Sequence, residues 1–266
     1  GGALAPMLAG GAVTGSAALA APSPYWQSPD GLVTVYHSRW EHVHAAGLLP
    51  VREVALVHAD PPYGVDERTE RASAGRGRGT SGTSRAIAKA NDFPRIIGDR
   101  KPFVPAALLS LARPTVLWGA NHYSERVPSS PSWLYWDKRR EVMSDDNADG
   151  ELAWTNLGGP LRRFVYLWKG ACQDGEKGQP RLHPTQKPIA LSSYVFQRAK
   201  LRPGDLVFVP YLGSGPDLPA AVAMGLRVIA CDVERWCCDT AIGRLGAITA
   251  EKAAEPVGPL FGGAHP

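Results

Sequence analysis

The chain has 266 residues, a length that suits one α/β domain with a sizeable core. Hydrophobic residues make up 44% of it and charged residues 20%, which is ordinary for a globular protein, and no apolar run is long enough to span a membrane. The formal net charge of +4 permits a polyanionic partner without requiring one.

Composition separates one folded domain, residues 25–250, from two tails. Residues 1–24 consist almost entirely of small and apolar residues and lack the basic start of a signal peptide, so we expect a disordered tail. Residues 251–266 contain Pro and Gly and are expected to be flexible. The four cysteines form no CxxC pair with further metal ligands, which favours buried thiols in a reducing cytoplasm over a metal site.

Two apolar runs near the start of the domain predict strands. Leu32–His37 is rich in Val and Tyr. Glu53–Ala59 must end at Asp60, because a proline cannot donate to a sheet and Pro61 and Pro62 follow.

The middle of the chain begins with a change of composition. Residues 65–100 are rich in Arg, Gly, Ser and Thr and show no clean period, which predicts a long basic loop that is functional or disordered. Beyond it we predict a helix over 105–111, strands over 115–119, 132–136 and 163–168, and a helix over 186–199 capped by Thr185.

The C-terminal part shows the clearest pattern, a β-turn-α-β-α unit around the glycine-rich turn 211–215. Its members are a strand over 205–209, a helix over 217–224, a strand over 227–231 that ends at Asp232, and a helix over 235–245. Such a unit predicts an α/β fold with a doubly wound, mostly parallel sheet.

The glycine-rich turn is the first candidate binding site. Gly213 and Gly215 let the backbone approach a ligand closely, and the following helix points its N-terminus at the same place. An acid at the end of the next strand, here Asp232, is where nucleoside-binding α/β folds bind a ribose diol. Ordinary turn glycines and a helix-capping Asp would give the same pattern.

Asp60-Pro61-Pro62-Tyr63 is the second candidate site, because it follows a strand at the edge where active sites of open α/β sheets lie. The exocyclic amine of a base is not basic. An Asp carboxylate and a neighbouring backbone carbonyl can accept hydrogen bonds from its N–H groups, so that the nitrogen can attack a methylsulfonium. Two prolines would stiffen the loop, and Tyr63 offers a ring for stacking on a flipped base. The alternative is a proline-rich turn without a function.

Together these blocks resemble the DNA adenine-N6 and cytosine-N4 methyltransferases in which the catalytic tetrapeptide precedes the cofactor-binding turn. The matching blocks are DPPY at 60–63, HPTQKP at 183–188, a DPFAGSG-like turn at 209–215 and the acid Asp232. Blocks at 118–123, 136–139 and 151–155 are similar to a phage and prophage branch of that family. The resemblance covers residues 25–246, and four blocks in order are specific where one alone is not.

The resemblance implies a Rossmann-like, seven-stranded fold, S-adenosylmethionine as methyl donor and double-stranded DNA as substrate. Asp60 favours adenine N6, because Asp is commoner at that position in the adenine enzymes. The implied catalytic residues are Asp60, Pro61, Pro62 and Tyr63. The implied cofactor-binding residues are Asp60, Thr185, Lys187, Tyr211, Gly213, Ser214, Gly215 and Asp232, with Lys187 facing the cofactor carboxylate.

Basic residues are the candidates for contacts with DNA phosphates. We expect them from Arg76 and Arg78 in the basic loop and from Lys138 and Arg139. The alternative for each is a solvated surface charge. The sequence predicts no metal, and it leaves open whether the chain forms a homodimer or acts with a restriction enzyme.

Two positions depart from the family pattern. Val209 stands where the family has an acid that faces the ammonium group of the cofactor, and Ser38-Arg39 stand where an acid often touches its adenine. We therefore expect weakened cofactor binding, with Asp217 as a partial substitute, and stronger binding after Val209→Asp. The departures support a further alternative beside the cytosine-N4 enzyme, a catalytically silent DNA-binding protein that keeps the fold.

Overall fold

The computed structural model describes residues 20–66, 93–139, 148–169, 172–176 and 181–247. Most of the two expected tails and most of the expected basic loop lie outside these residues, so the predictions for them stay predictions.

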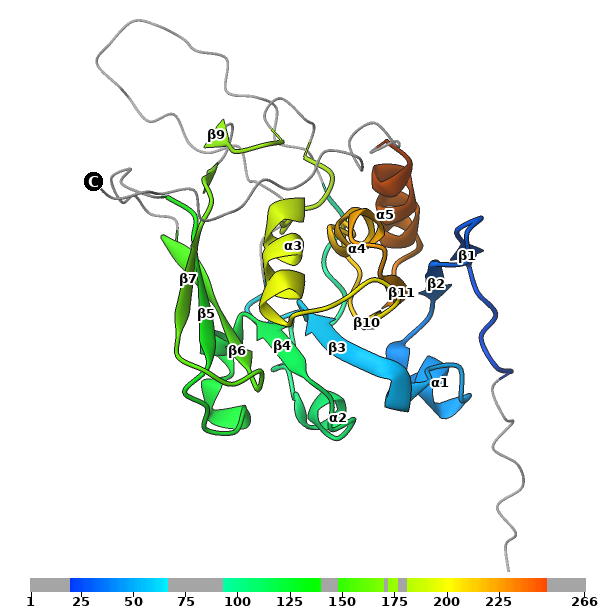
Figure 1. Cartoon of the computed structure of the whole chain (residues 1–266), viewed down its shortest axis with the longest axis horizontal. Helices are drawn as coiled ribbons and strands as arrows, with labels where there is room; N and C mark the ends of the chain where they lie inside the picture. The colour runs from blue at the N-terminus through cyan, green and yellow to red at the C-terminus, as the bar shows by residue number, and fades with distance from the viewer. Residues whose placement is uncertain (1–19, 67–92, 140–147, 170–171, 177–180, 248–266) are drawn as a thin grey trace, which may run out of the picture.

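A nine-stranded mixed sheet organises the described residues (Figure 1). Its strands are β1 (Trp26–Gln27), β2 (Val33–His37), β3 (Val54–Ala59), β4 (Thr115–Trp118), β5 (Trp133–Asp137), β6 (Gly150–Thr155), β7 (Arg162–Val165), β10 (Leu206–Val209) and β11 (Arg227–Asp232). They lie in the order β1-β2-β11-β10-β3-β4-β6-β5-β7. The short strands β8 (Trp168–Lys169) and β9 (Cys172–Gln173) pair separately.

Strand direction divides the sheet into two parts. The strands β2, β11, β10, β3 and β4 are parallel neighbours. On one side β1 runs antiparallel to β2, and on the other β6 runs antiparallel to both β4 and β5, while β7 is parallel to β5. The expected mostly parallel sheet is confirmed, but it has nine strands where the resemblance implied seven.

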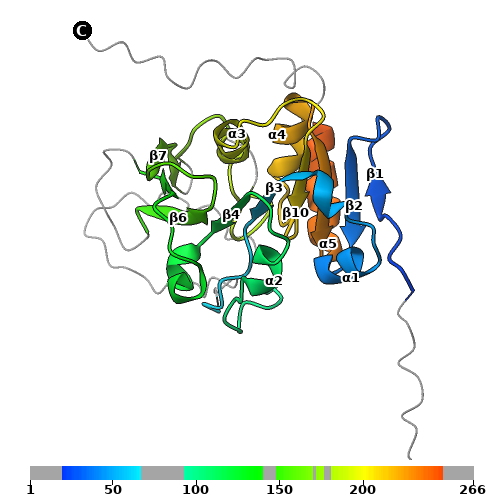
Figure 2. The same ribbon diagram turned by 60° about the horizontal axis from the view of Figure 1, so that its bottom comes forward.

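Helices cover both faces of the sheet (Figures 1 and 2). One layer holds α3 (Ile189–Arg198), α4 (Asp217–Ala223) and α5 (Arg235–Ala247), and the other holds α1 (Trp40–Ala45) and α2 (Ala106–Leu109). Three short 3-10 turns lie at Val51–Glu53, Ala120–His122 and Ser124–Arg126. The two layers make the expected doubly wound α/β architecture.

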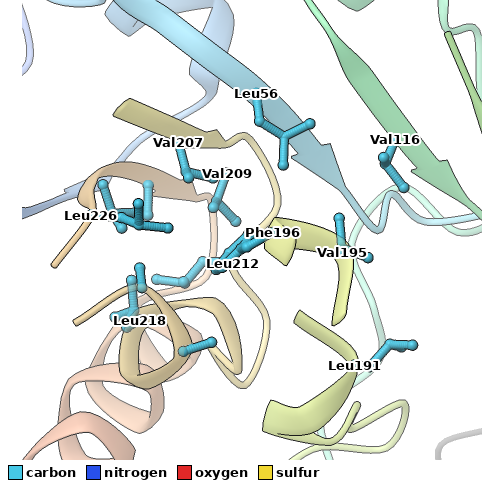
Figure 3. Packing of buried hydrophobic residues seen from close by; sticks show 14 of the residues in the cluster. Leu56, Val116, Leu191, Val195, Phe196, Val207, Val209, Leu212, Leu218 and Leu226 are labelled. Atoms are coloured by element: carbon cyan, nitrogen blue, oxygen red, sulfur yellow. The ribbon is translucent and has the colours of Figure 1, made fainter. Parts of the chain in front are cut away.

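Strand side chains alternate between these two layers. In β10, Val207 and Val209 pack toward α3 and α4, while Leu206 and Phe208 pack toward α1 and α2. Figure 3 shows Val207 and Val209 on the side of the sheet that carries Phe196 of α3. A strand with both faces covered needs apolar residues throughout, which is why the apolar run at 205–209 correctly predicted a strand.

The start of α3 differs from the prediction. The helix begins at Ile189, and Thr185 does not cap it. Pro188 is the reason, because the residue before a proline is biased away from the helical region, which disfavours a helix that includes Lys187. Glu176 serves the helix start instead: its Oε1 accepts a hydrogen bond from the Ile189 N–H at 2.9 Å.

Two absences hold for the described part of the chain. None of its helices is long and apolar enough to cross a bilayer. Nowhere in it do three or more His, Cys, Asp or Glu side chains come together in a way that could hold a metal ion.

Candidate active site

The parallel strands bring the candidate segments to one edge of the sheet. Asp60 follows β3, the turn 211–215 follows β10, and Asp232 ends β11, and these three strands are neighbours. Because the carboxyl ends of parallel strands meet at the same edge, the two predicted sites lie side by side.

Two further residues reach this edge through antiparallel pairing. Strand β6 pairs with β4 so that Ala153 lies opposite Trp118, and Glu151 therefore lies beyond the carboxyl end of β4. In β5, Asp137 lies opposite Gly150, which brings the following residue, Lys138, to the same edge. No local pattern of residues predicts this placement, because it depends on a pairing between distant strands.

Asp60, Tyr63, Lys138, Glu151 and Lys187 form a connected group, which we call the Asp60 cluster. The Lys187 Nζ lies 2.8 Å from Asp60 Oδ2 and 3.0 Å from Glu151 Oε2. The Tyr63 hydroxyl donates to Asp60 Oδ1 at 2.5 Å, and Lys138 forms an ion pair with Glu151. Lys187 therefore contacts the predicted catalytic carboxylate directly.

The charges of the cluster stabilise one another. Burial raises the pKa of the Glu151 carboxyl, but the ammonium groups of Lys187 and Lys138 outweigh burial and lower this pKa to about 2. Burial lowers the pKa of Lys187, and the carboxylates of Asp60 and Glu151 raise it above its ordinary value. Glu151 and Lys187 are thus both ionised at neutral pH. The Asp60 side chain is 28% exposed, against 20% for Lys138, 19% for Glu151 and 8% for Lys187, so Asp60 is the most accessible of these four charged groups.

Tyr63 is tightly held. Its ring stacks on His122 with centroids 5.2 Å apart and planes inclined by 13°. Gly119 has φ +67°, and a Cβ at that position would come within 2.1 Å of the Tyr63 ring. Burial raises the pKa of Tyr63, and the nearby charges of Asp60 and Glu151 raise it further, so its hydroxyl stays protonated.

The glycine-rich turn is organised by Asp232. The Gly213 N–H donates to Asp232 Oδ2 at 2.8 Å, and the Glu234 N–H donates to Oδ1 at 2.9 Å. Burial raises the pKa of Asp232, against the lowering effect of these N–H groups. Gly215 has φ +61°, and a Cβ there would lie 2.3 Å from Ala241 Cβ on α5. Gly213 and Asp232 are half-buried, whereas Ser214 and Gly215 are buried.

Tyr211 lies at the start of the same turn. Its hydroxyl accepts a hydrogen bond from the Trp40 Nε1–H at 3.3 Å, and its ring meets the edge of Phe103 at 5.9 Å. Burial raises the pKa of Tyr211 to about 12. Tyr211 thus joins the turn to the helix layer that contains α1.

The HPTQKP segment packs against α5 and the turn. The His183 ring stacks on Trp236 with centroids 5.1 Å apart, and the Thr185 N–H donates to His183 Nδ1 at 3.2 Å. Burial, with the charges of Lys187 and Arg181, lowers the pKa of His183 to about 3, so this imidazole is neutral at pH 7.

Arg244, which sequence reasoning missed, joins three parts of the site. It is 5% exposed. Its Nη1 donates to Ser214 Oγ at 3.1 Å, and its Nη2 donates to Glu176 Oε2 at 2.6 Å and to the Lys187 carbonyl at 3.1 Å. A buried arginine in α5 therefore links the glycine-rich turn, the HPTQKP segment and Glu176, whose carboxylate accepts the first N–H of α3.

Asp217 is not available as the expected substitute for the missing acid. It is 5% exposed, and its Oδ1 lies 2.6 Å from His58 Nδ1. The Trp118 Nε1–H donates to His58 Nε2 at 2.8 Å, so Nδ1 carries the proton and donates it to Asp217. This buried chain joins α4 to β3 and β4 and leaves Asp217 facing the protein interior.

Val209 also differs from the expectation that an acid at this position would face the cofactor. Its side chain is 1% exposed and belongs to the apolar layer that contains Leu212 and Phe196 (Figure 3). A carboxylate at 209 would enter that layer and lose its hydration. The expectation was wrong because the strand turns this side chain toward α3 and α4. Ser38 and Arg39 follow β2, and Arg39 is exposed.

The expected phosphate contacts are only partly placed by the structure. Arg139 is 3% exposed, and its Nε lies 2.7 Å from Asp149 Oδ1, which corrects the expectation of a surface contact. Lys138 is engaged by Glu151, and its side chain is 20% exposed. Arg76 and Arg78 lie outside the described residues.

Comparison with known proteins supports the fold. No model of a protein family matches the chain. PvuII DNA methyltransferase, a cytosine-N4-specific enzyme, superposes with a TM-score of 0.52 over 84% of this chain and 89% of its own, at 12% identity. M1.HpyAVI in complex with S-adenosylmethionine matches 80% of this chain and 98% of its own, with 16% identity and a TM-score of 0.47.

A third structure, TTHA0409 of Thermus thermophilus with S-adenosyl-L-methionine, matches 80% of this chain and 93% of its own, with 15% identity and a TM-score of 0.39. The superposition on the PvuII enzyme shows that the chain has the fold of a DNA methyltransferase. At this identity it shows the fold alone.

Proposed function

We propose that this chain transfers a methyl group from S-adenosylmethionine to the exocyclic amine of a flipped base in double-stranded DNA, with adenine N6 as the target. One observation carries the proposal. A partly exposed carboxylate, Asp60, lies at the carboxyl end of β3, beside the strand β10 that leads into the glycine-rich turn. This arrangement suits a reaction between a base and a nucleoside-type cofactor.

The chemistry of the chain's own residues centres on Asp60. Its carboxylate accepts a hydrogen bond from the target amine, which draws the N–H outward and frees the nitrogen lone pair for attack. The rigid Pro61-Pro62 loop holds this acceptor in one geometry. As the bond between this nitrogen and the transferred methyl carbon forms, the bond from that carbon to the sulfonium sulfur would break and leave a neutral thioether. The nitrogen then loses a proton to water.

The turn fits a nucleoside-type cofactor. When bound, S-adenosylmethionine would supply an electrophilic methyl group. Gly213 and Asp232 are half-buried and therefore accessible, and the Asp232 carboxylate, which accepts the N–H groups of Gly213 and Glu234, would be the acceptor for a ribose hydroxyl. Ser214 and Gly215 support this site through their contacts with Arg244 and Ala241.

The experiment is incubation of the chain with radiolabelled S-adenosylmethionine and unmethylated genomic DNA, followed by analysis of the nucleosides. N6-methyladenine is the expected product. If N4-methylcytosine forms instead, the proposed reaction is correct but the target base is cytosine, because the same acceptor geometry suits either amine. Label in neither nucleoside, in a preparation that binds the cofactor and DNA, would favour the silent DNA-binding alternative.

A further inference from the structure

Glu151 lies at the centre of the Asp60 cluster, although the block 151–155 to which it belongs supplied no candidate site residue. It is contributed by β6, through the antiparallel pairing of that strand with β4 and β5. Its two oxygens have different partners: Oε2 lies 3.0 Å from Lys187 Nζ, and Oε1 pairs with Lys138.

The cluster is balanced in charge. Asp60 and Glu151 supply two carboxylates, and Lys187 and Lys138 supply two ammonium groups. Lys187 is shared almost evenly, at 2.8 Å from Asp60 and 3.0 Å from Glu151. Its side chain is 8% exposed, so water screens these interactions little.

We infer that Glu151 is a positioning residue for methyl transfer, which acts by sharing the Lys187 ammonium with Asp60. The inference rests on the proposed function, because it assigns Glu151 a role in setting up the Asp60 carboxylate. Without the Glu151 carboxylate, Asp60 would be the only carboxylate in contact with the Lys187 ammonium. Lys187 would turn fully onto Asp60, and the carboxylate would become a weaker acceptor for the target amine.

The test is the variant Glu151→Gln, which keeps the size of the side chain and removes its charge. We expect kcat for methyl transfer to genomic DNA to fall on the order of tenfold. The KM for DNA and the Kd for S-adenosylmethionine should stay within about twofold, because Glu151 contacts neither ligand in this scheme. Glu53→Gln is the matched control, since Glu53 is exposed, pairs with Arg227 and precedes β3 at the opposite edge of the sheet from Asp60.

A second variant separates positioning from a simple structural role. Glu151→Gln combined with Lys138→Met restores the balance of charge and keeps the aliphatic stem of Lys138. The inference expects this double variant to stay about as slow as Glu151→Gln, because Asp60 is still the only carboxylate in contact with Lys187. A double variant that recovers most of the lost kcat would show that net charge and not sharing sets the rate, and this outcome, or an unchanged kcat in Glu151→Gln, would overturn the inference.

Failure of the proposed function would give a different result. A wild-type chain that methylates no base contradicts the proposed function by itself. Crystal structures of the wild type and of Glu151→Gln then decide the inference without turnover. It expects the Lys187 ammonium to leave residue 151 in the variant and to keep only its contact with Asp60, and an ammonium still shared between Asp60 and residue 151 would overturn it.

Discussion

Asp60 accepts hydrogen bonds from two directions, from Lys187 at Oδ2 and from the Tyr63 hydroxyl at Oδ1. If this carboxylate is the acceptor for the target amine, Asp60→Ala should lower the rate of methyl transfer by a factor on the order of 100 or more. Cofactor binding should change little. The check is single-turnover kinetics beside calorimetric titration with S-adenosylmethionine. Near-normal turnover in this variant would rule out the assigned role.

Val209 supports a prediction about stability. Val209→Asp places a carboxylate in an apolar layer, and we expect a loss of roughly 3 kcal/mol or more in the free energy of unfolding. Urea denaturation measures this loss. Val165→Asp on the edge strand β7 is the matched control, because Val165 is 39% exposed and should tolerate the change within about 0.5 kcal/mol. A Val209→Asp variant as stable as the wild type would mean that this side chain does not lie in the core.

His183 predicts a dependence of stability on pH. Its pKa is about 3 in the folded chain, against 6.5 for an ordinary histidine. As the pH falls below 6.5, His183 is protonated in the unfolded chain but stays neutral in the folded chain. The free energy of unfolding therefore decreases as the pH is lowered. His183→Gln should remove this contribution. Between about pH 7 and pH 5, a range above the titration of ordinary carboxyls, its unfolding free energy should fall less than that of the wild type.

The measurement for His183 is urea denaturation at both pH values, with His42→Gln on the exposed face of α1 as the matched control. If the free energy of unfolding falls equally between the two pH values in the wild type and in His183→Gln, then His183 is protonated in the folded chain. That result would contradict the burial that we describe.

Among the elements, α5 has a structural role through Arg244. Arg244→Met should destabilise the chain by roughly 3–5 kcal/mol, because Glu176 is left as a largely buried carboxylate without its partner. Arg227→Met is the matched control: its guanidinium is 43% exposed and pairs with Glu53, so we expect a change within about 1 kcal/mol. Thermal and urea unfolding measure both. An equal effect in the two variants would show that the buried contacts add nothing.

An element could be predicted where neighbouring residues in the sequence determine it, and not where it depends on pairing with a distant segment. The unit from β10 to α5 could be predicted because β10 is buried along its whole length, β11 is mostly apolar and each strand is followed by its own glycine or acid. The strand β6 was not predicted, and Glu151 with it, because its place depends on pairing with β4 and β5. Thr185 was assigned as a helix cap because the pattern of a polar residue before an apolar run outweighed the effect of Pro188.

The same rule holds for the candidate site: residues in local motifs were predicted, and contacts between distant segments were not. Asp60, Tyr63 and the turn were found because they follow strands in short motifs. Lys187 was found by its motif, but its contact with Asp60 was not, since the two residues are far apart in the sequence. Val209 was misjudged because a motif fixes the order of residues and not the face of the strand to which a side chain points.

At the scale of the whole molecule, the net charge of +4 fits a polyanionic partner. If the basic loop contacts DNA phosphates, replacing Arg76 and Arg78 together by Gln should reduce the slope of log affinity against log salt concentration by about 2. Fluorescence anisotropy with duplex DNA across a salt series measures the slope.

The matched control for DNA binding is the replacement of Arg52 and Arg202 by Gln. These exposed residues precede β3 and β10 and lie at the opposite edge of the sheet from Asp60, and the change in net charge is the same. An equal change of slope in both pairs would mean that overall charge, and not the loop, determines the affinity.

The close approach of Gly119 to the Tyr63 ring also limits how this chain can evolve. Any side chain at 119 would collide with the ring at its present place, and the positive φ disfavours every residue except glycine. A lineage that keeps the aromatic ring must keep the glycine, whereas one that exchanges Tyr63 for a small residue removes the collision but not the strain of the positive φ. An aromatic ring at 63 should therefore occur together with glycine at 119 among descendants of a common ancestor. Such a linked pair offers a way to recognise distant relatives at the low sequence identities found here.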